Sequence, residues 1–504
     1  MNMMHPKSRI RLLTCLLALS MTTTAMISCG EEPADDLTPT DSATIAETAV
    51  ETAEQETILI SDLPDMDWDG RVFNVLGWEG DRPQFVNFEI FAEKETGDVV
   101  NDAIFRRNSK IEETYHVKIA QELADYPASE LQKTVNAGEH RYDLAFLLLD
   151  EIGVAAQNGS FIDMKDVKHI DFSKPWWSAY ANDSVSLCGK LYFTTSDFCL
   201  RDKSRTYIMV YNINMVGEYD IPDPVQTVRD GDWTMELMTQ YVKQVSQDLD
   251  GDGKMGEMDK YGLGMDSYNA FAAFTFAQDN RLVSIDGEGK PYISADTERM
   301  VDSIDRALAL TCDKNYAIFC NDFIGKSSAD PWWVAYNAFC ENRELFMVTF
   351  VHELEDLSSA ADCNYGVLPF PKYDKAQENY ITSPDLYAMM FGIPATTDDS
   401  EFAGFMLEAL SAGSMNTSLH AYYEVACKTK YADNPDTAEM LDLIFDNIYF
   451  EPAMIYHNTM LFDLIATDAP QAKANRFASM FEKKSNAAQK SLDKVVSALT
   501  ELEH

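Results

Sequence analysis

Residues 248–259 have the acidic spacing of a calcium-binding loop of the EF-hand type. Carboxylates occupy positions one, three, five and twelve, and Gly253 at position six permits the sharp turn that wraps oxygen ligands around Ca²⁺. The predicted metal set is Asp248, Asp250, Asp252, Lys254 and Asp259. Position twelve carries Asp, which is shorter than the usual Glu, so weaker binding is expected. The non-helical exit after Lys260 favours one structural clip over a paired calcium sensor, and a solvated acidic turn is the alternative.

Tryptophans occur in adjacent pairs and beside the expected ends of strands and helices. Indole rings stack on the flat C–H faces of sugars, while polar neighbours bind the hydroxyl groups. Adjacent side chains of a regular element cannot both face one core, so each pair must expose a ring or lie on a loop. The aromatic candidates for ligand binding are Trp78, Trp176, Trp177, Trp233, Trp332, Trp333 and Tyr336. The alternative is that these rings pack helices together.

Residues 1–28 have the features of a secretory signal peptide. Basic residues precede an apolar run at 12–26, which is too short and too rich in Thr for a good transmembrane helix. A Cys at the cleavage point resembles a bacterial lipoprotein signal, in which the thiol is lipidated. Cys29 is therefore the predicted lipidation site, with plain secretion as the alternative.

Composition restricts the partners of the exported chain. The formal net charge of −43 argues against nucleic-acid binding, which requires a basic surface. A hydrophobic content of 46% is that of a well-packed globular protein. Residues 29–60 are acidic and contain few large apolar side chains, which predicts a disordered tether between the anchor and the folded part.

The sequence contains no recognisable catalytic or zinc motif. It has no Cys-x-x-Cys, no Gly-x-Ser-x-Gly and no phosphate-binding loop, and His352-Glu353 is not followed by a second His at metalloprotease spacing. Cys188 and Cys199 flank a segment that alternates like a strand, so a disulfide between them is one possibility and buried free thiols are the other. We expect no catalytic residues.

From Gly70 the chain alternates short apolar strands with amphipathic helices. Strands are expected at 71–77, 117–121 and 142–149, and helices at 99–115, 128–137, 234–247 and 472–502. The strand at 142–149 is apolar almost throughout, as a strand buried on both faces of a parallel sheet must be. This order predicts an α/β fold with an open sheet flanked by helices. Ligands bind such sheets beyond the carboxyl ends of the strands, where Trp78 lies.

Several segments together resemble a known family. They are Tyr142-Asp143 opening a strand, Gly189-Lys190-Leu191-Tyr192 leading to 207–214, Trp233-Thr234 opening a helix, and the segments 365–372 and 391–395. In order and spacing they resemble an extracellular solute-binding protein of an ABC importer, in the cluster that includes oligosaccharide binders. The resemblance covers nearly all of residues 68–500.

The resemblance implies a two-lobed fold of the periplasmic-binding-protein type II, with the ligand cleft between the lobes. Lobe 1 is expected to combine 68–200 with 348–398, and lobe 2 to combine 201–347 with 399–504. The long C-terminal helix is expected to pack across lobe 2. The resemblance also brings Asp197, Asn269 and Tyr380 near the cleft, where they would bind hydroxyl groups.

These observations predict a lipid-anchored, monomeric receptor on the extracellular face of the bacterial cell membrane. It would capture a solute, expected to be an oligosaccharide, and deliver it to an ABC permease by hinge closure, with structural Ca²⁺ as the only cofactor. A peptide or another metabolite stays open as the ligand. Two other hypotheses stay open: a lipid-anchored enzyme that degrades polysaccharides, and a surface glycan-binding adhesin or sensor subunit.

Overall fold

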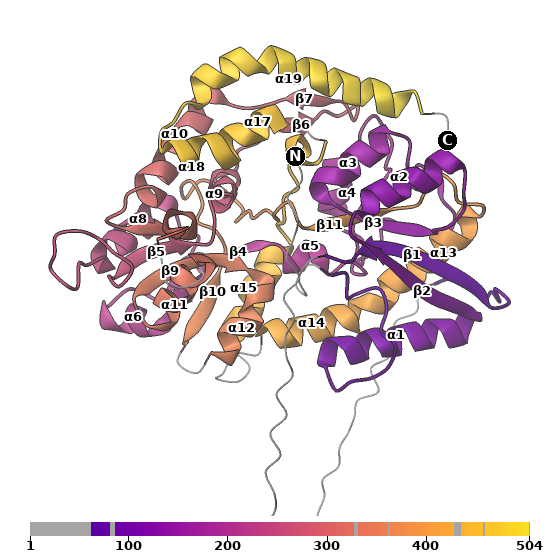
Figure 1. The fold of residues 1–504 in the computed structure, drawn as a ribbon, viewed down its shortest axis with the longest axis horizontal. Coiled ribbons are helices and arrows are strands. Elements are labelled where there is room, and N and C mark those ends of the chain that lie inside the picture. The colour runs from indigo at the N-terminus through magenta and orange to yellow at the C-terminus, as the bar shows by residue number, and fades with distance from the viewer. Residues whose placement is uncertain are drawn as a thin grey trace, which may run out of the picture. The chain divides into compact units, whose positions relative to one another are not determined.

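The computed structural model describes residues 62–80, 86–326, 331–360, 363–427, 435–456 and 459–502. The predicted signal peptide, Cys29 and the acidic tether lie outside these residues. The described part contains two separate mixed sheets with helices packed against them, which confirms the predicted fold class (Figure 1).

The first sheet has the strand order β11-β3-β1-β2. β1 (Arg71–Trp78) pairs in parallel with β2 (Val117–Ala124) and β3 (Leu144–Leu148), and β11 (Met389–Gly392) is antiparallel to β3. The connecting helices are α1 (Val99–Tyr115), α2 (Pro127–Ala137) and α3 (Leu149–Gln157). The strands and helices predicted before residue 150 are thus confirmed, with ends that differ by three residues at most. The carboxyl ends of the three parallel strands lie at one edge of this sheet.

The helix α1 begins after a capping side chain and ends at a residue in the left-handed conformation. Asp98 caps its start by accepting a hydrogen bond from the N–H of Asn101 (2.7 Å), and the chain leaves the helix at His116 in the left-handed conformation. Its buried face includes Ile111 and Tyr115, which pack into the core of the first sheet.

The second sheet has the strand order β10-β4-β9-β5-β8. Its strands are β4 (Tyr207–Asn212), β5 (Tyr261–Met265), β8 (Ala317–Phe319), β9 (Glu344–Phe350) and β10 (Tyr365–Leu368). The helices of this region are α6 (Ile213–Glu218), α7 (Pro224–Arg229), α8 (Met235–Val245), α9 (Ala270–Ala277), α10 (Thr297–Thr311), α11 (Val334–Cys340) and α12 (Leu354–Ser359). A two-stranded hairpin joins β6 (Val283–Ile285) to β7 (Pro291–Ile293). The predicted helix at 234–247 is observed as α8.

Two segments pack with the other lobe from the one to which the predicted boundaries assigned them. Residues 365–368, predicted within lobe 1, form β10 and pair with β4 of the second sheet. The helix α13 (Ser400–Met415), predicted within lobe 2, packs on the first sheet, and its Phe405 contacts Tyr115 of α1 at a centroid distance of 4.7 Å. The reason is that the chain returns to the first sheet only at residues 382–388, and the apolar α13 then covers that sheet.

The C-terminal part consists of helices that touch both cores. They are α14 (Ser418–Cys427), α15 (Pro435–Phe445), α16 (Pro452–Ile455), α17 (Thr459–Asp463), α18 (Ala469–Ala472) and α19 (Phe477–Thr500), with a π-helical segment at Leu464–Asp468. α19 confirms the predicted terminal helix, which packs across the second lobe as expected and also extends onto the first lobe. The helix runs across both lobes (Figure 1). Phe477, Ala488 and Leu492 pack with the second lobe's core, whereas Val495 and Leu499 pack with the first lobe. The hydroxyl of Tyr192 also donates to the carbonyl of Leu499 (2.9 Å).

Shorter helices complete the described chain. They are η2 (Met164–Asp166), α4 (Ala179–Val185), α5 (Arg201–Ser204), η3 (Cys320–Phe323), η4 (Pro331–Trp333) and η5 (Val351–Glu353). Cys188 and Cys199 are both free thiols, and Cys199 is buried where its sulfur contacts the carbonyl of Met389 (3.5 Å). None of the helices among the described residues is long and apolar enough to cross a membrane.

Candidate ligand-binding site at the lobe crossing

Two chain segments cross between the sheets, and they pair with one another. The N–H of Asp385 donates to the carbonyl of Arg205 (3.0 Å), and the N–H of Tyr207 donates to the carbonyl of Ser383 (3.2 Å). The first segment leads directly into β4 and the second into β11. Such paired crossings are where hinge rotation of two lobes takes place.

A buried ion pair joins the two crossings. The guanidinium of Arg205 donates to both carboxylate oxygens of Asp385, with 3.2 Å between Nε and Oδ1. It also lies over the ring of Phe350, 4.1 Å from the centroid. His352 donates through Nδ1 to the carbonyl of Ser204 (3.1 Å), which leaves Nε2 as the acceptor for Arg205 (3.4 Å). Burial, together with the nearby Arg205 charge, lowers the pKa of His352 to about 3, so its imidazole is neutral.

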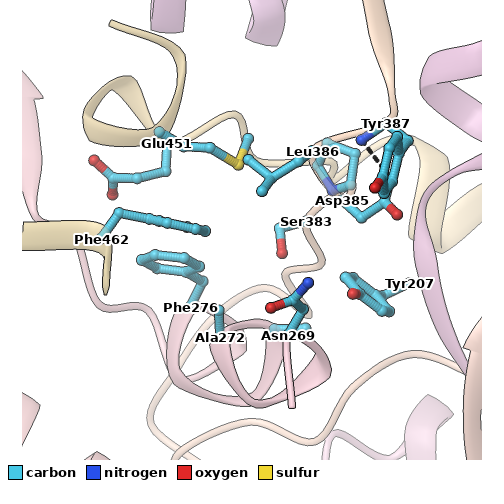
Figure 2. Close-up of a pocket in the computed structure, with 13 residues that line it drawn as sticks. Tyr207, Asn269, Ala272, Phe276, Ser383, Asp385, Leu386, Tyr387, Glu451 and Phe462 are labelled. Atoms are coloured by element: carbon cyan, nitrogen blue, oxygen red, sulfur yellow. Dashed lines mark hydrogen bonds between the residues drawn. The ribbon is translucent and has the colours of Figure 1, made fainter. Parts of the chain in front are cut away.

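A first cavity lies beside this crossing, and four aromatic rings contribute to its walls (Figure 2). It holds about 460 Å³ of empty space, part of it open to solvent. Its lining residues are Tyr207, Asn269, Ala272, Ala273, Phe276, Ser383, Pro384, Asp385, Leu386, Tyr387, Glu451, Met454 and Phe462. Flat apolar rings with a few convergent polar groups are the arrangement expected of a small-molecule site.

The walls of this cavity come from distant parts of the chain. Phe276 of α9 and Phe462 of α17 stack with their rings 6.2 Å apart and 16° from parallel. Asn269 precedes α9 with an exposed side chain that makes no capping bond to the helix. The carboxylate of Glu451 is already bonded to the N–H groups of Leu282, Val283 and Ala453 and to the hydroxyl of Tyr449. Glu451 therefore shapes the wall, while Asn269 presents polar atoms to a ligand.

Trp78 lies next to the cavity at the carboxyl end of β1. Its ring is parallel to that of Tyr387, with 6.1 Å between centroids and 5° between planes. The indole N–H donates to the carbonyl of Asp125 (3.0 Å), which fixes the ring at the edge of the first sheet. Tyr387 is 42% exposed and lines the cavity, so part of its side chain is accessible to a ligand. Tyr126, which is 74% exposed, follows Asp125 along the same edge.

A second and larger cavity lies beside the start of the first crossing segment, at Arg201 and Ser204. It holds about 1590 Å³ of empty space, again partly open. Arg201 and Ser204 line it, whereas Tyr207, three residues later, lines the first cavity. Its other lining residues are Val86, Asn87, Phe88, Phe91, Asp98, Val100, Asn101, Ile104, Gln121, Leu123, Val351, His352, Glu355, Asp356 and Tyr422. The side-chain amide oxygen of Gln121 is buried and has no hydrogen-bond partner within the described part of the chain. A ligand could donate a hydrogen bond to this oxygen.

The predicted pair Trp176 and Trp177 lies in a core instead. Each indole is 4% exposed, and the two N–H groups donate to the two carboxylate oxygens of Glu408 (3.2 and 2.9 Å). Both rings reach one core because they lie on an irregular segment before α4, as the loop alternative requires. Burial raises the pKa of Glu408 to about 7, against the lowering effect of the indole donors. Neither indole lines the two cavities.

Three other predicted site residues also have packing or structural partners. Trp233 is fully buried, and its N–H donates to the carbonyl of Pro369 (2.9 Å). The hydroxyl of Tyr380 donates to the carbonyl of Val228 (3.1 Å), and the side chain is 6% exposed. Asp197 lies 4.0 Å from the ammonium of Lys203, and burial raises its pKa to about 7. None of the three lines the cavities at the crossing.

The second predicted tryptophan pair lies on the turn η4. Trp333 is 44% exposed and meets the ring of Tyr336 edge-on at 4.8 Å, and Tyr336 donates to the carbonyl of Asp356 (2.9 Å). The side chain of Trp332 lies outside the described residues. The turn η4 contacts η3, whose Asn321 accepts a hydrogen bond from the backbone N–H of Tyr268 (2.7 Å), beside Asn269. Trp333 lines neither of the two cavities.

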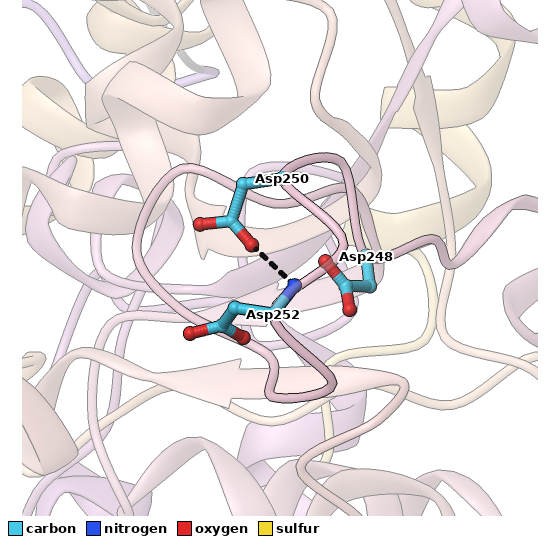
Figure 3. Close-up of side chains that lie close together, drawn as sticks. All are labelled: Asp248, Asp250 and Asp252. Carbon is cyan, nitrogen blue, oxygen red and sulfur yellow. Dashed lines mark hydrogen bonds between the residues drawn. The ribbon is translucent and has the colours of Figure 1, made fainter.

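The acidic loop brings three of its predicted metal ligands together (Figure 3). Asp248, Asp250 and Asp252 each offer a carboxylate oxygen, and these oxygens lie within 4.8 Å of one another. Backbone N–H groups of Gly253 and Gly251 donate to Asp248 (2.8 and 2.7 Å) and lower its pKa. Both glycines adopt positive φ, at 79° and 74°, which side chains rarely tolerate.

The two remaining predicted ligands, Asp259 and Lys254, are not part of the cluster of three converging carboxylates. Asp259 is 3% exposed and accepts the N–H groups of Leu249 (2.8 Å) and Gly256 (2.6 Å), so its carboxylate closes the loop. Lys254 donates its backbone N–H to Asp252 (2.7 Å). The loop therefore fits Ca²⁺ through three converging carboxylates, with Asp259 holding the two ends of the loop together.

Of the residues predicted from the sequence, Asn269 lines the first cavity and Trp78 stacks on the lining residue Tyr387, whereas the other aromatic rings of the wall were not predicted. Phe276 lies in a helix that is apolar except for Thr275, and such a segment gives no sign that one ring faces a cavity. Tyr387 lies in the return crossing at 382–388, and its position was not predicted because that crossing was expected at residue 348; His352 lies in η5, directly after β9. The Pro-Asp-Leu-Tyr sequence at 384–387, a turn before an apolar strand, was the one available signal for Tyr387.

Solved structures share this fold. The chain matches a sugar transporter from Rhizobium etli, in an open conformation, with a TM-score of 0.56 and 13% identity over 86% of this chain and 100% of the other. It matches an ABC substrate-binding protein from Listeria monocytogenes in complex with cycloalternan, with a TM-score of 0.51 and 12% identity over 86% and 100%. An acarbose-binding receptor of Streptomyces glaucescens matches with a TM-score of 0.50 and 16% identity over the same shares.

These matches confirm the two-lobed fold of the solute-binding proteins. No protein-family model matches the chain, and no curated protein matches its sequence. The fold is therefore established by structure, and the ligand must be argued from the site itself.

Proposed function

We propose that this protein is an extracellular receptor that captures a carbohydrate and delivers it to an ABC permease. The observation that carries the proposal is the aromatic cavity at the lobe crossing, with Tyr387 stacked on Trp78 and the amide of Asn269 beside it. Ring faces bind the C–H faces of sugars, and the amide binds hydroxyl groups. The fold's solved neighbours that bind cycloalternan and acarbose support the same class of ligand.

The mechanism is hinge closure about the two crossings. A ligand that contacts both the first-sheet edge, through Tyr387, and the second lobe, through Asn269, binds the closed form better than the open form. Binding therefore shifts the population toward closure, and the permease would recognise that form. No bond is made or broken in this process. A monomer suffices, because both lobes belong to one chain.

The test of the ligand class is a thermal-shift screen of the protein from residue 60 onward with oligosaccharides, monosaccharides and short peptides. Ligand at a hundredfold excess over Kd stabilises the native state by about 2.7 kcal/mol. We expect a shift with one class of glycan that Tyr387→Ala reduces and Tyr292→Ala leaves unchanged, because Tyr292 is also exposed but lies on β7 away from both cavities. Equal shifts of the melting temperature in both variants would contradict a role of Tyr387 in ligand binding.

Membrane attachment through Cys29 is part of the proposal. The basic start, short apolar run and Cys at the cleavage point are the sequence features that support it. Metabolic labelling with a fatty-acid analogue tests it, with Cys29→Ala as the variant and Cys15→Ala as the control within the apolar run. Labelling should disappear in Cys29→Ala alone, and labelling that persists there would contradict lipidation.

We also propose that the loop at 248–259 binds Ca²⁺ as a structural ion. Its three converging carboxylates and the two glycines at positive φ are the supporting observations. The ion would offset the mutual repulsion of Asp248, Asp250 and Asp252 and order the connection between α8 and β5.

A further inference from the structure

Cys340 and Cys363 end two segments that β4 holds side by side. Cys340 is the last residue of α11, and Cys363 stands two residues before β10. Asn212 of β4 donates through its amide to the carbonyl of Phe339 (2.9 Å) and lies opposite Tyr365 in the β4–β10 pairing. Asn212 therefore contacts the residue before Cys340 and pairs with the residue two positions after Cys363.

The two thiols contact each other in the core of the second lobe. Cys363 is 2% exposed within that core, and Cys340 is half-buried at its boundary. The side chains are hydrogen-bonded to one another, and this bond is the main cause that lowers the pKa of Cys340 and raises that of Cys363. A half-buried thiol whose pKa is lowered, beside a second thiol, is the arrangement that favours thiol–disulfide exchange.

The other cysteines with described side chains have different surroundings. Burial raises the pKa of Cys188, Cys199, Cys312 and Cys320, which disfavours their thiolates. Cys312 contacts the hydroxyl of Thr311, and Cys199 contacts a backbone carbonyl. Among the described residues, the structure therefore singles out Cys340 and Cys363 as the pair prepared for oxidation.

We propose that Cys340 and Cys363 are a redox pair that closes to a disulfide when the chain meets a disulfide oxidant. The Cys340 thiolate attacks one sulfur of the oxidant's disulfide and releases its other sulfur as a thiol. Cys363 then loses its proton and displaces the second thiol from Cys340. One protein disulfide forms, one oxidant disulfide is reduced, and the two thiol protons of the protein pass to the two released thiols.

Closure would restrain a segment that lines the second cavity. The chain between the two cysteines contains His352, Glu355 and Asp356, all of which line that cavity. Tyr336 of α11 already holds the same segment through the carbonyl of Asp356 (2.9 Å). A bond between Cys340 and Cys363 would therefore fasten α11 and β10 together at the base of the cavity wall, and so stabilise the second lobe.

The test uses the whole exported chain, incubated with oxidised or reduced glutathione and then alkylated and digested. We expect a peptide cross-linked between Cys340 and Cys363 after oxidation, and a melting temperature about 2 °C or more above that of the reduced protein. The increase should vanish in Cys340→Ser and in Cys363→Ser, and persist in Cys312→Ser. Oxidation of the unaltered protein that gives no such peptide, or cross-links Cys340 equally to other cysteines, would overturn the proposal.

Discussion

Asp385 holds Arg205 from the neighbouring crossing segment, and both side chains are buried. Each of its carboxylate oxygens accepts a guanidinium N–H, while its backbone N–H donates to the carbonyl of the same Arg205 (3.0 Å). Oδ1 of Asp385 also accepts the backbone N–H of Tyr387 (2.9 Å). The ion pair that joins the crossings thus also positions the ring that forms the cavity wall.

Replacing Asp385 with Ala should destabilise the protein strongly. The change leaves the Arg205 guanidinium buried without its carboxylate, which typically costs about 3–5 kcal/mol. Urea denaturation followed by circular dichroism measures the free energy of unfolding. Arg229→Ala is the matched control, because Arg229 forms ion pairs with Asp436 and Glu439 on the surface. Similar losses in the two variants would show that the crossing pair has no special role.

Calcium should raise the melting temperature of the unaltered protein. The double variant Asp250→Asn plus Asp252→Asn removes two of the three converging carboxylates, so the calcium-dependent rise should be lost. Asp313→Asn alters a partly buried acid that accepts the backbone N–H of Asn315 in a different turn, and that variant should keep the rise. Equal stabilisation of the double variant by Ca²⁺ would contradict a calcium site in this loop.

Glu408 should make stability fall as the pH rises from about 4.5 to about 7. Its pKa is raised from the ordinary value of 4.5 to about 7 in the folded protein, so the native state binds more protons than the unfolded state in this window. The contribution of Glu408 to the free energy of unfolding is fully present below the unfolded-state pKa of 4.5. It is lost as the pH rises through the folded-state pKa of about 7. In Glu408→Gln the free energy of unfolding should decrease less between pH 5 and pH 8, as measured by denaturant titration at each pH.

A control for the Glu408 prediction lies on the same helix. Glu401 is bonded to Lys168 and His169, which lower its pKa, so Glu401→Gln removes a dependence of the opposite sign. That variant should therefore keep the decrease of stability toward pH 8. A Glu408→Gln protein with the same pH dependence as the unaltered one would show that Glu408 does not titrate in this range.

Local patterns predicted the elements of the first sheet well. The helix at Val99–Tyr115 was predicted with its observed bounds, because its apolar spacing is a local feature of the sequence. The apolar run that forms Leu144–Leu148 likewise indicates a strand buried on both faces. The acidic loop was also recognisable, since its carboxylates and glycines follow one another along the chain.

The surroundings of the tryptophans were not predictable from such patterns. Trp176 and Trp177 are buried because Glu408, far along the sequence, accepts both of their N–H groups. Trp233 is buried by a bond to the carbonyl of Pro369 in a distant segment. The position of Tyr387 depends on where the chain crosses between the sheets, and that crossing is defined by the pairing of β10 with β4. Each of these facts requires contacts between remote segments.

The measurement that tests the central claim most directly is titration calorimetry of the unaltered protein, with calcium present, against purified oligosaccharides and against short peptides. The account predicts saturable binding of one class of oligosaccharide, and recovery of that glycan unchanged by chromatography after prolonged incubation. Binding of peptides but of no glycan would contradict the carbohydrate assignment. Cleavage of the glycan would contradict a receptor that makes and breaks no bonds.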